Sequence, residues 1–80
     1  KPHATLIIDA GAVKALQQRK SLLAVGVAEA GGQFVKGELI EIAGPDGSII
    51  AYARTRIDSG ELATCAGSQV VVHANDLSLL

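Results

Sequence analysis

The feature that most constrains the fold is a β-hairpin pattern in the middle of the chain. The motif GPDGS at residues 44–48 separates two apolar runs. Its proline presets φ, and its Asp-Gly pair accepts the dihedral angles of a tight turn. The run before it, ELIEI at residues 38–42, approximates the alternation of a half-buried strand, and a strand resumes at residues 49–57. The pattern therefore predicts a hairpin over residues 38–57.

The first part of the chain predicts a strand followed by a helix. The segment ATLII at residues 4–8 is β-branched and apolar, which is typical of strands. Asp9 follows it and is a good N-cap, because its carboxylate can accept a hydrogen bond from a free N–H of the first helical turn. Residues 10–18 favour a helix, and Val13 and Leu16 fall on one face of it at helical spacing.

The rest of the chain supplies further strands, turns and one short helix. The expected elements are a strand at 21–30, turns at 31–32 and 36–37, a helix at 59–66, a strand at 69–73, and a loop with an apolar tail at 74–80. Asp58 or Ser59 would cap the short helix, and with Asp58 as the cap Glu61 occupies the capping-box position. This order of elements predicts an α+β domain built on a mixed sheet or a small open barrel.

The composition excludes several classes of protein. With 80 residues, 49% of them hydrophobic, the chain is expected to form one small globular domain and not a disordered segment. Phe34 and Tyr52 are the only aromatic residues, so we expect an aliphatic core and no aromatic platform for stacked bases. The net charge of −1 argues against a strong general nucleic-acid binder.

The sequence also bears on cellular location. No apolar run approaches the roughly 20 residues needed to cross a bilayer, and no signal pattern is visible at the N-terminus. The chain begins with Lys1, so we expect it to be a piece of a longer polypeptide. Cys65 is the single cysteine, which fits a reducing compartment. We therefore expect a cytoplasmic protein with no membrane association.

No catalytic or metal-binding set is predicted. His3 and His73 lie at opposite ends of the sequence, and further ligands would come from side chains with no recognisable metal spacing. Cys65 with His73 could act as nucleophile and base, but a free cysteine more often packs as a small apolar residue. The motifs AGGQF and GPDGS match neither phosphate-loop pattern. We expect no catalytic residue, metal or cofactor in this chain.

Basic residues are the remaining candidates for a site. They are Lys14, Arg19, Lys20, Lys36, Arg54 and Arg56. Arg19 and Lys20 are expected in the last turn of the first helix, where cations complement the helix dipole. Tyr52, Arg54 and Arg56 are expected on one face of a strand. Scattered cations usually form a solvated surface; the alternative is that Arg19 and Lys20 gather with the two strand arginines to contact phosphates.

An ordered set of motifs covers almost the whole chain. It comprises DAGAVKAL, SLLAVGV, GGQFVKGELIEI, PDGSIIA, DSGEL and VVVHAND. In this order the set resembles the C-terminal PUA domain of bacterial glutamate 5-kinases, and its first part is similar to PUA domains generally. The resemblance implies a small pseudo-barrel of mixed strands with one or two short helices, in agreement with the α+β prediction.

The resemblance also implies where a ligand would bind. PUA domains of RNA-modifying enzymes bind RNA around the first helix, the glycine-containing strand-to-helix junction and neighbouring strands. With the strand arginines included, the candidate nucleic-acid site is Gly11, Lys14, Arg19, Lys20, Arg54, Arg56 and His73. Gly11 either allows a close approach of the backbone or is a first-turn glycine with no role. Two departures weigh against RNA binding: Ala74 stands where the family commonly has arginine, and the segment 63–69 is shorter than in the family.

The expected function follows from the resemblance. Residues 1–80 are expected to be one PUA-like domain, the non-catalytic accessory or regulatory domain of a glutamate 5-kinase. The kinase domain, outside this sequence, would use ATP and Mg²⁺ to phosphorylate glutamate in proline biosynthesis. It would be the partner of this domain, and oligomerisation would occur through the parent enzyme. The alternative is an autonomous RNA-binding module.

Overall fold

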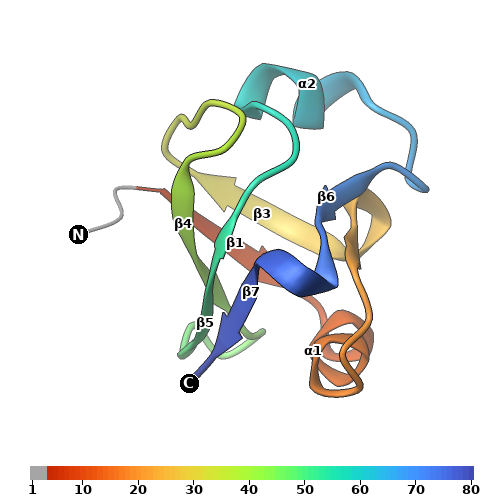
Figure 1. Ribbon diagram of the computed structural model, residues 1–80, viewed down its shortest axis with the longest axis vertical. Helices are drawn as coiled ribbons and strands as arrows, with labels where there is room; N and C mark the ends of the chain where they lie inside the picture. Colours follow the sequence, from red (N-terminus) through yellow and green to blue (C-terminus); the bar gives the residue numbers. More distant parts are fainter. Residues whose placement is uncertain (1–3) are drawn as a thin grey trace.

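Five strands form one mixed sheet in the order β3-β1-β4-β5-β7 (Figure 1). The computed structural model describes residues 4–80. The strands are β1 (Thr5–Ile8), β3 (Val27–Gly31), β4 (Leu39–Ala43), β5 (Ile49–Arg54) and β7 (Leu77–Leu79). β1 runs parallel to β4, whereas the β1–β3, β4–β5 and β5–β7 pairs are antiparallel. The predicted mixed sheet is confirmed.

A second sheet pairs two short strands from opposite halves of the chain. It consists of β2 (Leu22–Leu23) and β6 (Val70–Val72), which run antiparallel. The helical elements are α1 (Ala10–Gln17), α2 (Ser59–Thr64) and the 3-10 helices η1 (Ala24–Gly26) and η2 (Ala74–Asp76). In Figure 1, α1 and α2 lie at opposite ends of the molecule with the strands between them. The expected α+β fold with one or two short helices is confirmed, and the α-helices are two.

The hairpin of β4 and β5 has the predicted turn. Ile42 lies opposite Ala51, and the turn closes with a hydrogen bond of 3.0 Å from the Gly44 N–H to the Ser48 carbonyl. Gly47 has φ +86°, a conformation that glycine adopts without steric cost. The Asp46 carboxylate accepts hydrogen bonds from the backbone N–H and the hydroxyl of Ser48, each at 3.0 Å. Those two bonds hold the pKa of Asp46 below its ordinary value.

The face predicted for Arg54 and Arg56 is confirmed, and it points outward beyond the end of the strand. Ala53, Thr55 and Ile57 are buried, whereas Arg54 and Arg56 are exposed. The strand itself ends at Arg54, three residues before the predicted end at 57. The reason is a change of partner: the Arg56 N–H donates to the Val71 carbonyl of β6 at 2.7 Å instead of continuing the pairing with β4.

The core is aliphatic, as the composition predicts. Its largest fully buried side chains are Leu6, Ile8, Leu16, Leu22, Ile40, Ile42, Ile57, Val71 and Val72. They come from both sheets, from α1 and from the segment after β5, and burial of this apolar surface is the main favourable term in folding. Phe34 is also buried, at 3% exposure. The buried Thr55 hydroxyl donates to the Val35 carbonyl at 3.1 Å, so its polar atom is satisfied.

The strand predicted at 21–30 is wrong as a single element. The segment is divided into β2, η1 and β3, and its two ends pair with different strands, β6 and β1. The division occurs at Gly26, whose carbonyl accepts a hydrogen bond of 3.0 Å from the Asp9 N–H. The residue types of an apolar run do not show which strand each residue pairs with. The break between β2 and β3 could therefore not be identified from the hydrophobic periodicity.

The tail is also different from the prediction. Residues 74–80 were expected to form a loop with an apolar tail, but they contain η2 and the edge strand β7. Leu77 pairs with Ala53, and Leu79 pairs with Ala51 of β5. The segment is short and its side chains are mostly exposed, so the backbone pairing to β5 determines its conformation.

The second helix is shorter than predicted but begins as expected. It spans Ser59–Thr64, whereas the prediction ended at 66. Asp58 is the N-cap, because its Oδ1 accepts a hydrogen bond of 2.7 Å from the Glu61 N–H. β6 at Val70–Val72 falls within the predicted strand at 69–73.

Candidate functional site

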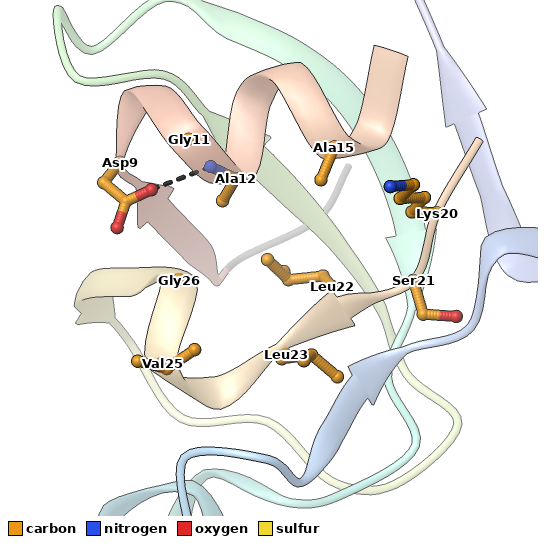
Figure 2. Close-up of a pocket in the computed structure, with 10 residues that line it drawn as sticks. All are labelled: Asp9, Gly11, Ala12, Ala15, Lys20, Ser21, Leu22, Leu23, Val25 and Gly26. Atoms are coloured by element: carbon orange, nitrogen blue, oxygen red, sulfur yellow. Dashed lines mark hydrogen bonds between the residues drawn. The ribbon is translucent and has the colours of Figure 1, made fainter. Parts of the chain in front are cut away.

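A cavity of about 520 Å³ lies between α1 and the segment that follows it. We call it the α1 cavity. The residues around it are Asp9, Gly11, Ala12, Ala15, Lys20, Ser21, Leu22, Leu23, Val25 and Gly26, drawn in Figure 2. This region corresponds to the first two motifs of the sequence, DAGAVKAL and SLLAVGV. The cavity is therefore built by one continuous stretch of chain, from the N-cap of α1 to the end of η1.

Asp9 joins the two walls of the α1 cavity. Its Oδ1 accepts a hydrogen bond of 2.8 Å from the Ala12 N–H, which confirms the predicted N-cap of α1. Its backbone N–H donates to the Gly26 carbonyl at 3.0 Å. A Cβ on Gly26 would lie 2.8 Å from the Ala12 Cβ, closer than real side chains approach. A glycine at 26 therefore lets η1 pack directly against the first turn of α1.

At the C-terminal end of α1, Arg19 and Lys20 lie in different hollows. The Lys20 N–H donates to the Ala15 carbonyl and the Arg19 N–H to the Leu16 carbonyl, each at 3.0 Å. This pair of bonds is the Schellman arrangement that ends many helices. Arg19 occupies its left-handed position with φ +62°, where glycine is usual. Lys20 then lines the α1 cavity, whereas Arg19 lines another hollow beside Ala74.

The position predicted for Arg19 and Lys20 was wrong. Both were expected in the last turn of the helix, but α1 ends at Gln17 and the basic residue in its last turn is Lys14. The sequence 17–20 is uniformly polar, so it did not mark the point at which the helix ends.

The chemistry of the α1 cavity is mostly apolar. Alanine, leucine and valine side chains form most of its walls. Asp9 and Lys20 are its charged residues, and Figure 2 shows them at opposite ends of the stretch that lines it. Leu23 and Val25 are 37% and 72% exposed, so the apolar surface continues outside the cavity. Such a site favours a ligand with an apolar body and polar ends.

The remaining predicted site residues lie elsewhere. Lys14 is exposed on α1 and does not line the α1 cavity. Arg54 donates from Nη1 to the Gly37 carbonyl at 3.1 Å. Arg56 and His73 share a smaller hollow beside β6. Gly11 and Lys20 thus line the same cavity from its two ends (Figure 2), and Arg56 and His73 line the smaller hollow. The nucleic-acid role of all seven residues stays a prediction.

Leu23 and Val25 were not predicted as surface residues. Their signal in the sequence is a glycine, Gly26, inside an apolar run, which marks a close approach of backbone segments. The Val25 N–H donates to the Gly67 carbonyl at 3.0 Å, and this bond holds η1 beside the loop after α2. This bond fixes the backbone at Val25, and the pairing of Leu23 with Val70 fixes it at Leu23. Both side chains are exposed in this arrangement.

Cys65 and His73 have structural contacts. Cys65 is partly buried against the core, and its Sγ donates to the Leu62 carbonyl at 3.5 Å. The His73 Nδ1 accepts a hydrogen bond of 3.1 Å from the Asn75 N–H and so caps η2. Within residues 4–80, no three His, Cys, Asp or Glu side chains are grouped to hold a metal ion. His3, considered as a metal ligand, lies outside the described residues.

The helices of the described part of the chain are short. None of those within residues 4–80 combines the length and the hydropathy needed to span a bilayer.

The family model of the PUA domain matches residues 4–75 of the chain. Among curated proteins, the glutamate 5-kinase of Cereibacter sphaeroides is 46% identical over 67 residues, and that of Mycobacterium tuberculosis is 40% identical over 83 residues. The alignments cover 84% and 90% of this chain but only 18% and 22% of the two kinases. The chain therefore spans less than a quarter of the length of these relatives.

Solved structures share the fold. A conserved PUA domain protein from Thermoplasma acidophilum matches with a TM-score of 0.71 at 25% identity, over 86% of this chain and 47% of that one. An archaeal box H/ACA sRNP Nop10-Cbf5 complex contains a chain that matches with a TM-score of 0.83 at 18% identity. That match covers 96% of this chain and 24% of the other.

Proposed function

This chain belongs to the PUA domain family, and from that premise we propose that it is the non-catalytic accessory domain of a glutamate 5-kinase. The observation that supports the proposal is the 40–46% identity to glutamate 5-kinases over 84–90% of the chain. The order of the motifs, from DAGAVKAL to VVVHAND, agrees with it. The identities to the kinases are higher than the 25% identity to the Thermoplasma acidophilum PUA domain protein and the 18% identity to the chain of the Nop10-Cbf5 complex.

In this proposal the chemical step occurs in the kinase domain of the longer enzyme. That domain would bind ATP and Mg²⁺ and phosphorylate glutamate in the cytoplasm. The role of the present chain would be to regulate the activity or the assembly of the enzyme. The apolar surface around Leu23 and Val25 is suited to contact another protein domain, since exposed apolar patches commonly mark interaction surfaces.

The test is to express the full-length gene product with and without residues 4–80. We expect the truncated enzyme to keep glutamate-dependent consumption of ATP and to differ in its inhibition by the end product or in its oligomeric state, measured by kinetics and by size-exclusion chromatography with light scattering. Two results would overturn the proposal. One is a gene that encodes no kinase domain beside this chain, and the other is a truncated enzyme identical to the full-length one in all three measurements.

A second candidate function is RNA binding. It is favoured by the cationic residues around the end of α1, Lys14, Arg19 and Lys20, and by the likeness to a chain of an H/ACA sRNP complex. Contacts to phosphates release counterions, so binding to a structured RNA would weaken steeply as salt increases. Replacing both Arg19 and Lys20 by alanine would reduce binding to many sequences alike. An absence of binding at low salt would eliminate this function.

A further inference from the structure

A second hollow, of about 340 Å³, lies beside β6 and is lined by cationic side chains. We call it the basic hollow, and its lining residues are Lys36, Arg56, Gln69, Val70 and His73. It shares no lining residue with the α1 cavity. We propose that the basic hollow binds the phosphate group of a small-molecule ligand.

Arg56 is held in place at both its backbone and its side chain. Its N–H donates to the Val71 carbonyl at 2.7 Å, which fixes the residue beside β6. Its Nε donates to Asp76 Oδ2 at 3.2 Å, in an ion pair that is exposed to solvent. This pair uses Nε and leaves the two terminal nitrogens of the guanidinium for a ligand. Two parallel N–H donors on a planar group suit the oxygens of a phosphate.

Lys36 is placed by a tight turn that is anchored to the residue before Arg56. The Gly37 N–H donates to the Thr55 carbonyl at 2.8 Å, and the Thr55 N–H donates to the Glu38 carbonyl at 3.1 Å. Gly37 has φ +87°, so the turn depends on glycine. The Lys36 side chain is exposed and forms no ion pair among the described residues. Its ammonium group is therefore available to an anion in the basic hollow.

His73 supplies a third donor. Because its Nδ1 accepts the Asn75 N–H at 3.1 Å, the ring nitrogen left to donate is Nε2. The ring is then a hydrogen-bond donor to an anion through Nε2. With Asp76 balancing one of the two cations, the group keeps a net positive charge. Donors from three chain segments match a tetrahedral phosphate better than a planar carboxylate, because phosphate has more acceptor oxygens.

The test is a titration of the ¹⁵N-labelled chain with inorganic phosphate, followed by NMR and compared with sodium chloride at equal ionic strength. We expect saturable shifts of the backbone amides of Lys36, Arg56 and His73, with smaller changes at Lys14 and Lys20. A parallel titration uses a short single-stranded oligoribonucleotide. Saturation by the oligoribonucleotide at these amides without saturation by phosphate would overturn the assignment to a small ligand. No saturable shift with either probe would overturn the site itself.

Two variants and a matched control test which residues bind. Lys36→Ala and Arg56→Ala should each weaken phosphate binding by about tenfold, the usual effect of losing one charge-assisted hydrogen bond. Gln17→Glu lowers the net charge by the same one unit at an exposed residue outside the hollow and should leave the affinity unchanged. Equal losses in Gln17→Glu and Lys36→Ala would show unspecific electrostatic attraction and overturn the proposal. The NMR spectrum shows whether Arg56→Ala folds. If it does not fold, the comparison of Lys36→Ala with its control tests the proposal without it. These results do not depend on the kinase assignment.

Discussion

Gly26 faces Ala12 at a distance that leaves no room for a side chain on Gly26. A Cβ built there would lie 2.8 Å from the Ala12 Cβ. We expect Gly26→Ala to destabilise the chain by about 1–3 kcal/mol, the usual cost of overpacking, because η1 must move away from α1. Urea unfolding followed by circular dichroism measures the change. Gly11→Ala is the control, since a Cβ there makes ordinary contact at 3.4 Å and alanine favours the helix. Equal stability of Gly26→Ala and the unchanged chain would contradict the prediction.

Arg19 is a non-glycine residue in the left-handed position at the end of α1, with φ +62°. Replacing it by glycine removes the steric cost of this conformation but increases the entropy of the unfolded chain. We expect Arg19→Gly to stabilise the chain by about 0.5–1 kcal/mol. Gln17→Gly, two residues earlier in regular helix, should destabilise it by about 1 kcal/mol. Thermal unfolding shows whether each variant is more or less stable than the unchanged chain. A destabilising effect of Arg19→Gly would count against the left-handed conformation of Arg19 at the end of α1.

Asp9 satisfies one free N–H of α1 through its carboxylate. Asp9→Ala should lower the free energy of unfolding by about 1 kcal/mol because that N–H loses its partner. Asp9→Asn keeps an acceptor oxygen at the same place and should retain most of the stability. Denaturant titrations compare the three proteins. A loss in Asp9→Asn as large as in Asp9→Ala would assign the effect to charge instead of to the cap.

Asp46 has a pKa below its ordinary value of 3.8, because the Ser48 N–H and hydroxyl stabilise the carboxylate. A group whose pKa is lowered by folding contributes stability above its unfolded pKa and loses it as pH falls through the folded pKa. The contribution of Asp46 is therefore present at neutral pH and is lost below about pH 3.8. Carboxyl NMR titration should show the pKa of Asp46 rising only part of the way toward 3.8 in Ser48→Ala, because the backbone N–H of residue 48, the larger cause, remains. An unchanged pKa in that variant would contradict the contribution of the hydroxyl.

Local signals in the sequence explain which parts of the fold were predictable. Asp9 and Asp58 each have a side chain that caps a helix within a few residues, and GPDGS determines its turn by its own residue types. The burial alternation through Ala53 and Ile57 follows from the two-residue period of a strand. The overall fold was predicted from the resemblance to the PUA family, and the family match over residues 4–75 confirms that prediction.

The parts that were predicted wrongly depend on partners distant in the sequence. Leu22 pairs with Val72, and Leu79 pairs with Ala51. The residue types next to these positions do not indicate either pairing. The same limitation applies to the site. Nothing in the sequence near Lys36 shows that its turn is anchored beside Arg56, because the bonds that do this join Gly37 and Thr55.

The parallel pairing of β1 with β4 has a consequence for the order in which the molecule is made. Thr5 can pair with Gly31 of β3 early, but it must wait for Glu41 before β1 has a partner on its other side, and Leu22 must wait for Val72 before β2 has any partner. During synthesis, the first third of the chain therefore leaves the ribosome before most of the sheet that buries its apolar side chains exists. The domain should acquire its native structure in one late step, after β6 has emerged. Contacts between such distant residues also favour slow folding.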